Sequence, residues 1–192
     1  MRQSVPGRKA GLLIFQAGYT LVEILMVMAL GTILLSIAVP SMTEMLNTQR
    51  SNAAGSSFLA SLNLARAEAI KRNARVVICK SAAGLSCDLA GGWNQGRIMF
   101  HDVNNNAALD ADEQLIERHG AMPDSLSLTG NTQVANYVSY SASGSAKLVS
   151  GAFQAGTFTF CRMPVSSAEV QQIVLSSTGR ARSKKGVATD CQ

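Results

Sequence analysis

Three stretches of this 192-residue chain carry side chains whose type and spacing could do chemistry. One glutamate, Glu23, lies inside an otherwise apolar run at 21–39. Carboxylates and amides recur at short intervals through 102–113, and four cations crowd into the six positions 180–185. The chemistry these patterns suggest is charge pairing within a membrane, binding of a hard cation, and contact with phosphate, respectively.

Glu23 is the most informative of these residues. The run from Leu21 to Val39 can cross a bilayer, since about 20 residues at roughly 1.5 Å each span about 30 Å. A lone carboxylate there costs on the order of 2.5–3.5 kcal/mol and is usually paired and functional. A secretory signal peptide or an uncleaved anchor would leave Glu23 unexplained. Cleavage between Gly18 and Tyr19 would instead create an α-amine four residues away, and the amine and carboxylate of neighbouring subunits could neutralise each other in lipid.

The residues before Gly18 carry positive charge and no acid, which favours their retention on the cytoplasmic side. Arg2, Arg8 and Lys9 account for three of the five excess positive charges, so cleavage leaves about +2 on the mature chain. Overall charge therefore gives no argument for nucleic-acid binding, and only a local cluster of cations could supply one.

The stretch 102–113 has two interpretations. Oxygen-bearing side chains occupy its positions 1, 3, 5, 9 and 12, which is the ligand spacing of an EF-hand calcium loop. Position 6 is Ala107, where the sharp turn favours glycine, and both flanks predict strands rather than helices. We favour a polar hairpin loop whose Asn and Asp serve turn geometry, and calcium remains the alternative. The candidate ligands are Asp102, Asn104, Asn106, Asp110 and Glu113.

The basic cluster lies near the C-terminus and is expected to follow the last strand as a tail. Such a cluster can bind phosphates, and arginine can also stack on bases. The alternative is a solvated segment that aids solubility or contacts another subunit. The residues concerned are Gly179, Arg180, Arg182, Lys184 and Lys185.

Four cysteines in a chain with an export-type N-terminus indicate two disulfides outside the cytosol. Of the three possible pairings we favour the sequential one, Cys79 with Cys87 and Cys161 with Cys191. The second would close a loop of about 30 residues, worth roughly 3–4 kcal/mol in the chain-entropy model. A zinc site made from all four lacks any Cys-x-x-Cys spacing. We expect no cofactor beyond the possible calcium.

An enzymatic function is not predicted. His101 and His119 are the only histidines, and neither lies in a recognisable nucleophile–base pattern. The sequence also has no Gly-x-Ser-x-Gly nucleophile elbow.

The elements that position these residues are a long helix and a series of strands. Pro40 removes a backbone donor, so we expect a kink or local unwinding there but not the end of the helix. Phe58, Leu62, Ala65 and Ala69 then share one helical face, and the helix should end near Asn73. One helix followed by short strands predicts an α+β fold, with the helix packed on antiparallel sheet. The expected strands are 76–79, 96–100, 114–117, 126–128, 137–140, 157–160 and 172–175.

The N-terminal motif resembles the cleavage site of type IV pilins and type II secretion pseudopilins. The matching residues are Gly18-Tyr19-Thr20-Leu21-Val22-Glu23-Ile24-Leu25, with Pro40 at the twenty-second mature position. The resemblance implies that a prepilin peptidase cuts after Gly18 and methylates the new N-terminus, and that Glu23 guides assembly. Tyr19 departs from the usual Phe but keeps the aromatic ring.

The order of later segments is similar to that of the GspH/FimT minor pseudopilins. It runs from the helical residues 64–72 through 76–79, 91–96, 98–100 and 102–113 to Ser176-Ser177-Thr178-Gly179-Arg180. In FimT-like proteins of DNA-uptake systems a Gly-Arg-x-Arg segment is associated with DNA binding, and Gly179, Arg180 and Arg182 match it. The resemblance thus implies a filament subunit with possible binding of double-stranded DNA; a pseudopilin acting in protein secretion without DNA, and a tethered nucleic-acid-binding module, are the alternatives.

These inferences predict four regions and a location. A leader at 1–18 is removed, a transmembrane helix covers 19–40, an amphipathic helix covers 41–74, and a β-rich domain covers 75–192. The mature protein should cross the bacterial inner membrane once, with the β-rich domain in the periplasm and other pilin or pseudopilin subunits as partners.

Overall fold

The computed structural model describes residues 18–163, 169–187, 189 and 191, apart from the side chains of Pro40, Glu44 and Glu169. The proposed leader, except Gly18, lies outside the described residues. The chain divides into two compact units, 1–45 and 46–192, and helix α1 (Leu21–Arg72) contributes to both. This helix runs through position 40 without interruption, so the expectation that it continues past Pro40 is confirmed and local unwinding is not found there, while the alternative of a kink stays a prediction.

The C-terminal end of α1 is a hydrogen-bonded Schellman cap. Asn73 adopts a left-handed conformation with φ of 49°. Its N–H donates to the carbonyl of Ile70 at 3.2 Å, and the N–H of Ala74 donates to the carbonyl of Ala69 at 3.1 Å. These two bonds satisfy carbonyls that the last turn leaves open, and asparagine tolerates the required backbone better than most residues do. The helix therefore ends where the sequence predicts.

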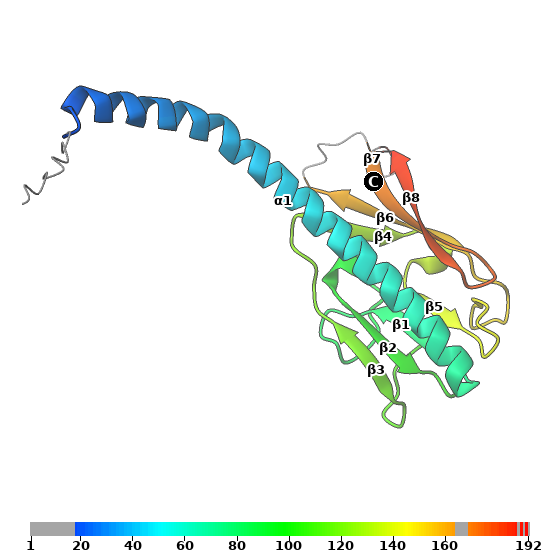
Figure 1. Ribbon diagram of the computed structural model, residues 1–192. Coiled ribbons are helices and arrows are strands. Elements are labelled where there is room, and N and C mark those ends of the chain that lie inside the picture. Colours follow the sequence, from blue (N-terminus) through cyan, green and yellow to red (C-terminus); the bar gives the residue numbers. More distant parts are fainter. Residues whose placement is uncertain (1–17, 164–168, 188, 190, 192) are drawn as a thin grey trace, which may run out of the picture. The chain divides into compact units, whose positions relative to one another are not determined.

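Eight strands follow the helix and form two antiparallel sheets rather than one (Figure 1). The first has the order β3-β2-β1-β5 and the second β4-β6-β7-β8. Their bounds are β1 Val76–Lys80, β2 Arg97–His101, β3 Leu115–His119, β4 Leu126–Gly130, β5 Tyr137–Tyr140, β6 Gly156–Arg162, β7 Glu169–Leu175 and β8 Ala181–Val187. Two short 3-10 helices, η1 Trp93–Gln95 and η2 Thr132–Val134, lie in the connections.

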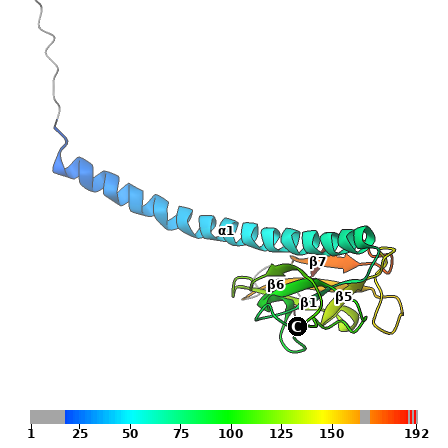
Figure 2. The same ribbon diagram turned by 90° about the horizontal axis from the view of Figure 1, so that it is seen from below.

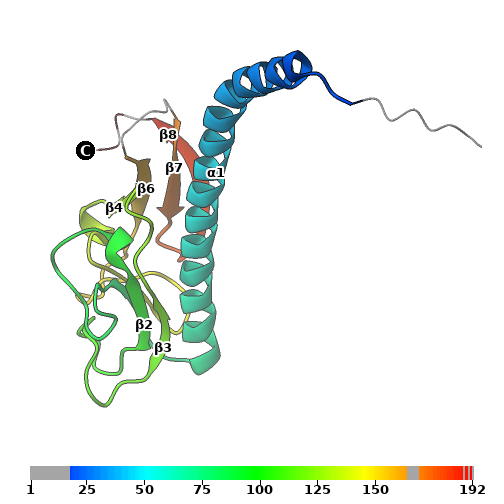
Figure 3. The ribbon, with the colours of Figure 1, turned by 90° about the vertical axis from the view of Figure 1, so that its left-hand side faces the viewer.

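Both sheets lie on the same side of the 46–72 part of α1 (Figures 2 and 3). The predicted stripe of Phe58, Leu62, Ala65 and Ala69 is fully buried and forms one core with residues from both sheets. The Phe58 ring makes edge-on contacts with Trp93, with a centroid distance of 5.4 Å, and with two phenylalanines of β6. Aromatic pairs of this kind add to the burial of apolar surface, so this stripe joins the two sheets to the helix.

Two disulfides join Cys79 to Cys87 and Cys161 to Cys191, which is the sequential pairing. The first closes the loop after β1, and the second ties the segment after β8 back to β6. Cys79 also belongs to a smaller apolar cluster with Val77, Ile98 and Phe100, on the face of the first sheet that points away from the main core.

Candidate functional site

The start of α1 brings together the residues of the expected processing and assembly motif. The N–H of Glu23 donates to the Thr20 hydroxyl at 3.2 Å. Threonine at the cap and glutamate three residues later form the sequence of a capping box, and the helix N-terminus favours a negative charge nearby. Thr20 is a residue that our sequence reasoning missed as a cap, although the Thr-x-x-Glu spacing could have revealed it.

Tyr19 and Glu23 lie along the same side of this helix end and line one hollow with Ile24, Val27 and Met28. The large apolar side chains from Leu21 to Leu46 are exposed in the single chain. The most apolar 18-residue window of α1 has a mean hydropathy of 2.4, so the helix is long and apolar enough to cross a membrane. An acidic side chain in such a surface needs either lipid headgroups or a partner charge.

The 102–113 loop is a hydrogen-bonded hairpin connection between β2 and β3. Asp102 is buried, and its two carboxylate oxygens accept the N–H groups of Asn106 and Ala107 at 3.2 Å each. Glu113 receives the N–H groups of Val103 at 2.7 Å and Asp110 at 3.2 Å. Both terminal carboxylates of the EF-hand-like pattern therefore cap backbone donors within the loop.

The remaining candidate ligands also bond to one another. The amides of Asn104 and Asn106 both donate to the same oxygen of Asp110, at 2.8 Å each. Ala107, at the position where we expected glycine, does take the left-handed turn with φ of 57°. Its methyl group is buried against the smaller apolar cluster, which explains a residue other than glycine there. Within the described residues no group of three or more His, Cys, Asp or Glu side chains is arranged to hold a metal ion.

The basic cluster is not a tail, and that prediction is wrong. Residues 181–187 form β8, an edge strand that pairs with β7 along its whole length. A β-turn at Ser176–Gly179 joins the two strands: Gly179 donates its N–H to the Ser176 carbonyl at 2.8 Å, and Ser176 donates to the Arg180 carbonyl at 3.0 Å. Gly179 has φ of 79°, as the residue after a type I turn in a three-residue hairpin requires. The cations are thus carried on a hairpin.

Strand pairing separates the cations onto two faces. Arg182 lies opposite Val174 and Lys184 opposite Gln172, whereas Lys185 lies opposite Gln171. Opposed side chains in an antiparallel pair point to the same face, and successive residues alternate. Because Ile173 and Leu175 point into the helix-side core, Arg182 and Lys184 project from the opposite face and Lys185 from the helix side. All three cations are exposed, as is Arg180 beside the turn.

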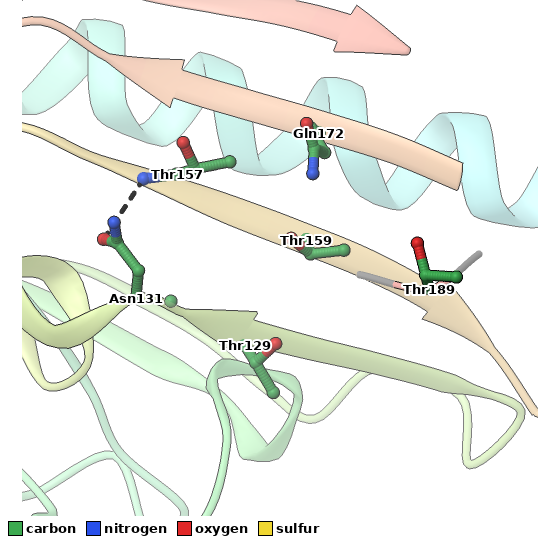
Figure 4. Close-up of a pocket in the computed structure, with 7 residues that line it drawn as sticks. Thr129, Asn131, Thr157, Thr159, Gln172 and Thr189 are labelled. Atoms are coloured by element: carbon green, nitrogen blue, oxygen red, sulfur yellow. Dashed lines mark hydrogen bonds between the residues drawn. The ribbon is translucent and has the colours of Figure 1, made fainter. Parts of the chain in front are cut away.

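The face that carries Arg182 and Lys184 is polar (Figure 4). A cavity of about 460 Å³ lies on it, between strands β4, β6 and β7. The figure shows threonine and glutamine side chains standing on the strands while α1 passes behind them, and the Thr157 N–H donates to the Asn131 side chain at 3.2 Å. The lining residues are Thr129, Gly130, Asn131, Thr157, Thr159, Gln172 and Thr189.

The position of the hairpin is held by contacts to α1 and to the turn after β5. Arg66 of the helix donates from Nε to the Gly144 carbonyl at 2.9 Å and from Nη2 to the Thr178 carbonyl at 3.3 Å. Gly179 packs against the Gly144 carbonyl so closely that a Cβ atom would overlap it. The cations at the start of β8 therefore have a defined place relative to the helix.

Comparison with solved structures identifies this arrangement as a pilin-like fold. The type IV minor pilin FimU of Pseudomonas aeruginosa aligns with a TM-score of 0.53 and 17% identity, covering 72% of this chain and 90% of FimU. The minor pseudopilin EpsH from the type 2 secretion system of Vibrio cholerae aligns at 0.49 and 12%, covering 70% of this chain and 96% of EpsH. A search of curated proteins finds no match.

The family follows from the sequence. The model of the family described as type II transport protein GspH matches residues 54–179, and the prokaryotic N-terminal methylation motif matches residues 15–39. The chain belongs to the GspH family. The resemblance inferred from the N-terminal motif and from the order of segments is confirmed.

A first prediction concerns the close approach of Gly179 to Gly144. Gly179→Ala adds a methyl group that overlaps the Gly144 carbonyl and also strains a left-handed residue, so we expect unfolding to become easier by about 2–4 kcal/mol. Gly151→Ala is the matched control: its φ is 85°, but its Cβ would meet nothing within 4 Å, and it should cost about 1 kcal/mol. Urea unfolding of the mature protein in detergent measures both. Equal losses would mean that backbone strain alone, and not the Gly144 contact, governs this turn.

A second prediction tests the two interpretations of the 102–113 loop. Asp102→Ala leaves two backbone N–H groups without their acceptor, so the free energy of unfolding should fall by about 1–3 kcal/mol even in EDTA. Asp112→Ala is the control within the same loop, because Asp112 is exposed. A loss that appears only when millimolar calcium is present would show that Asp102 acts as a metal ligand instead.

Proposed function

We propose that this protein is a minor subunit of a type IV pilus or type II secretion filament, cut between Gly18 and Tyr19 and anchored in the bacterial inner membrane. The match to the N-terminal methylation motif is the observation that carries this proposal. The exposed apolar surface of α1 supports it, since such a surface needs lipid or neighbouring helices to cover it. The β-rich unit would then lie in the periplasm, and the role would be structural rather than catalytic.

In this proposal Glu23 provides the register of assembly. Cleavage leaves the α-amine of Tyr19 one helical turn from Glu23, at a helix end where the Thr20 hydroxyl already caps the Glu23 N–H. An amine and a carboxylate from adjacent subunits attract strongly in hydrocarbon, where neither can be hydrated. Docking by any other register would leave the carboxylate unpaired, so the pair favours one axial position.

The third prediction follows from this pairing. Glu23→Gln keeps the side-chain shape but removes its charge, so processing should continue while incorporation into sheared surface filaments falls at least about tenfold, the equivalent of about 1.4 kcal/mol. Met28→Ala, at another residue that lines the same hollow, is the control. Mass spectrometry distinguishes precursor from mature chain, and immunoblotting of filaments measures incorporation. Wild-type incorporation of the Gln variant would contradict the role of Glu23.

As a second function, we propose that the β7–β8 hairpin binds double-stranded DNA through its phosphates. Arg180, Arg182 and Lys184 are exposed, and within the described residues no ion pair joins any of them to a carboxylate. Arg182 and Lys184 share one face with the polar side chains beside the 460 Å³ cavity. Cations on a rigid strand are spaced for successive phosphates, and neighbouring hydroxyl and amide groups can donate hydrogen bonds to the same backbone. The competing proposal is a secretion pseudopilin whose hairpin contacts only protein.

The fourth prediction separates these two roles. Binding of the mature protein in detergent to a fluorescent duplex should weaken with salt along a log–log slope of about −3 to −4 if four phosphates are contacted. Arg180→Ala combined with Arg182→Ala should reduce the magnitude of that slope by about 2. The charge-matched control combines Arg50→Ala with Arg118→Ala, two exposed cations that are not part of the hairpin. Equal binding by the hairpin variant and the wild type would favour the secretion role without DNA.

A further inference from the structure

A buried arginine without a carboxylate partner lies beside the helix. Arg97, the first residue of β2, is only 3% exposed. Its Nε donates to the Ser61 hydroxyl at 3.1 Å, its Nη2 donates to Ser57 and Ser61 at 3.0 Å each, and its guanidinium lies 5.3 Å from the centre of the Phe58 ring. Two serines and an aromatic face fix the orientation of the guanidinium, but none of them carries a negative charge.

The charge on Arg97 is not neutralised within the described part of the chain. Nη1 donates no hydrogen bond among these residues. Glu117 on β3 acts on it electrostatically, but Glu117 Oε1 pairs with His119 Nε2 at 2.9 Å instead. Burial lowers the pKa of Arg97 to about 10, and Glu117 raises it only in part. Arg97 is therefore still protonated at neutral pH, and a buried cation without a counter-charge is costly.

Arg97 lines a cavity of about 440 Å³ between α1 and the end of β3. Arg50, an exposed residue of α1, His119 and Ser57 also line the cavity, so its polar side chains are two arginines, one histidine and one neutral hydroxyl, with no carboxylate among them. The other walls are small or apolar, with Ala53 and Ala54 on the helix and Met122 and Pro123 after β3. An occupant that fits this lining has a short apolar stem and a single negative head.

We propose that this cavity receives the carboxylate side chain of an aspartate or glutamate from a neighbouring subunit of the filament. The head would accept from Arg97 Nη1 and lie close to Arg50, while the methylene stem would contact Met122 and Pro123. The pair would neutralise Arg97 at the moment the cavity closes against the neighbour, when charge-assisted hydrogen bonds are strongest. The identity of the donor as a filament subunit rests on the proposed function; the carboxylate preference rests on the cavity alone.

A carboxylate fits the cavity better than a phosphate does. The cavity offers one free guanidinium nitrogen, one exposed arginine and one histidine, and much of the remaining lining is apolar. Phosphate sites usually supply several backbone or arginine donors to three oxygens, and such a set is not gathered here by the described residues. The apolar walls would favour the alkyl stem of an acidic residue over a free inorganic anion.

The experiment uses the mature full-length protein in detergent micelles with N-acetyl-glutamate methylamide as the probe. Side-chain Nε–H resonances of arginine report binding by NMR, with inorganic phosphate and N-acetyl-glutamine methylamide as comparison ligands. The Arg97 resonance should shift with the glutamate probe and not with the glutamine probe. Arg50→Ala should weaken binding about threefold, and Arg97→Lys, which loses the planar fork, at least tenfold. Arg118→Ala, on the same strand as His119 but facing away, should change nothing.

Glu117 provides a second test that leaves the Arg97 side chain itself unchanged. If the cavity binds a carboxylate from another molecule, Glu117→Gln should leave binding of the glutamate probe unchanged or strengthen it, because one competing negative charge is removed. Loss of binding in this variant would overturn the proposal, as would an Arg97 resonance that moves with phosphate but not with the glutamate probe.

Filament incorporation then tests the source of the carboxylate. Arg50→Ala, whose side chain is exposed and so should not disturb folding, is expected to reduce incorporation into sheared filaments severalfold. If the probe binds but this variant assembles normally, a neighbouring subunit is not the donor. If the wild-type chain itself is absent from sheared filaments, the filament function fails, and the two failures are distinguishable because probe binding does not depend on assembly.

Discussion

The apolar stripe on the 46–72 part of α1 is the constraint on which the rest of the molecule depends. Both sheets bury their inner faces against Phe58 and the three residues that follow it at helical spacing. Full burial of one such large side chain is worth about 1.5–3 kcal/mol, and both sheets contribute buried residues to the same core as this stripe. The stripe must therefore remain helical and in register, and this in turn determines where β2 and the β7–β8 hairpin meet the helix.

One helix serves two environments. Before residue 46 its large apolar side chains are exposed in the single chain, whereas from Phe58 onward the face that carries Leu62, Ala65 and Ala69 is buried by the sheets. In the proposed filament the first part would supply surface for lipid or for neighbouring helices, and Glu23 would be the one point of charge pairing on it. The second part provides the scaffold on which Arg66 holds the hairpin turn and the two serines orient Arg97.

Much of this organisation could be predicted from the residues. Periodicity and turn residues predict the helix face, its end near Asn73, the α+β class and the position of most strands. A 3.6-residue apolar stripe indicates a helix, and alternating apolar runs indicate strands. β8 was missed because it is an edge strand whose two faces both carry polar or charged residues, so alternation left no signal. Two sheets rather than one also could not be predicted, since strand order depends on pairing between distant segments.

The basic character of the Arg97 cavity could not be predicted either. In the sequence Arg97 is one cation at the start of an apolar strand, and nothing in its neighbours indicates that α1 covers it. Arg97 is buried because it contacts Ser61 and Ser57, which precede it by 36 and 40 residues in the sequence. In the loop at 102–113 the ligand-like spacing can be read from the sequence, but its meaning cannot. The same oxygens that suggest a metal site also accept hydrogen bonds from backbone N–H groups in a tight turn.

The contact between Gly179 and the Gly144 carbonyl restricts substitution at the turn but not along β8. The turn itself cannot accept a side chain at position 179 without moving two loops, so its shape should persist through sequence drift. The exposed positions of β8 beyond it meet no such barrier, and their charges can be exchanged without altering the backbone. A protein built this way can acquire or lose an affinity by point substitution at the strand while its fold is preserved.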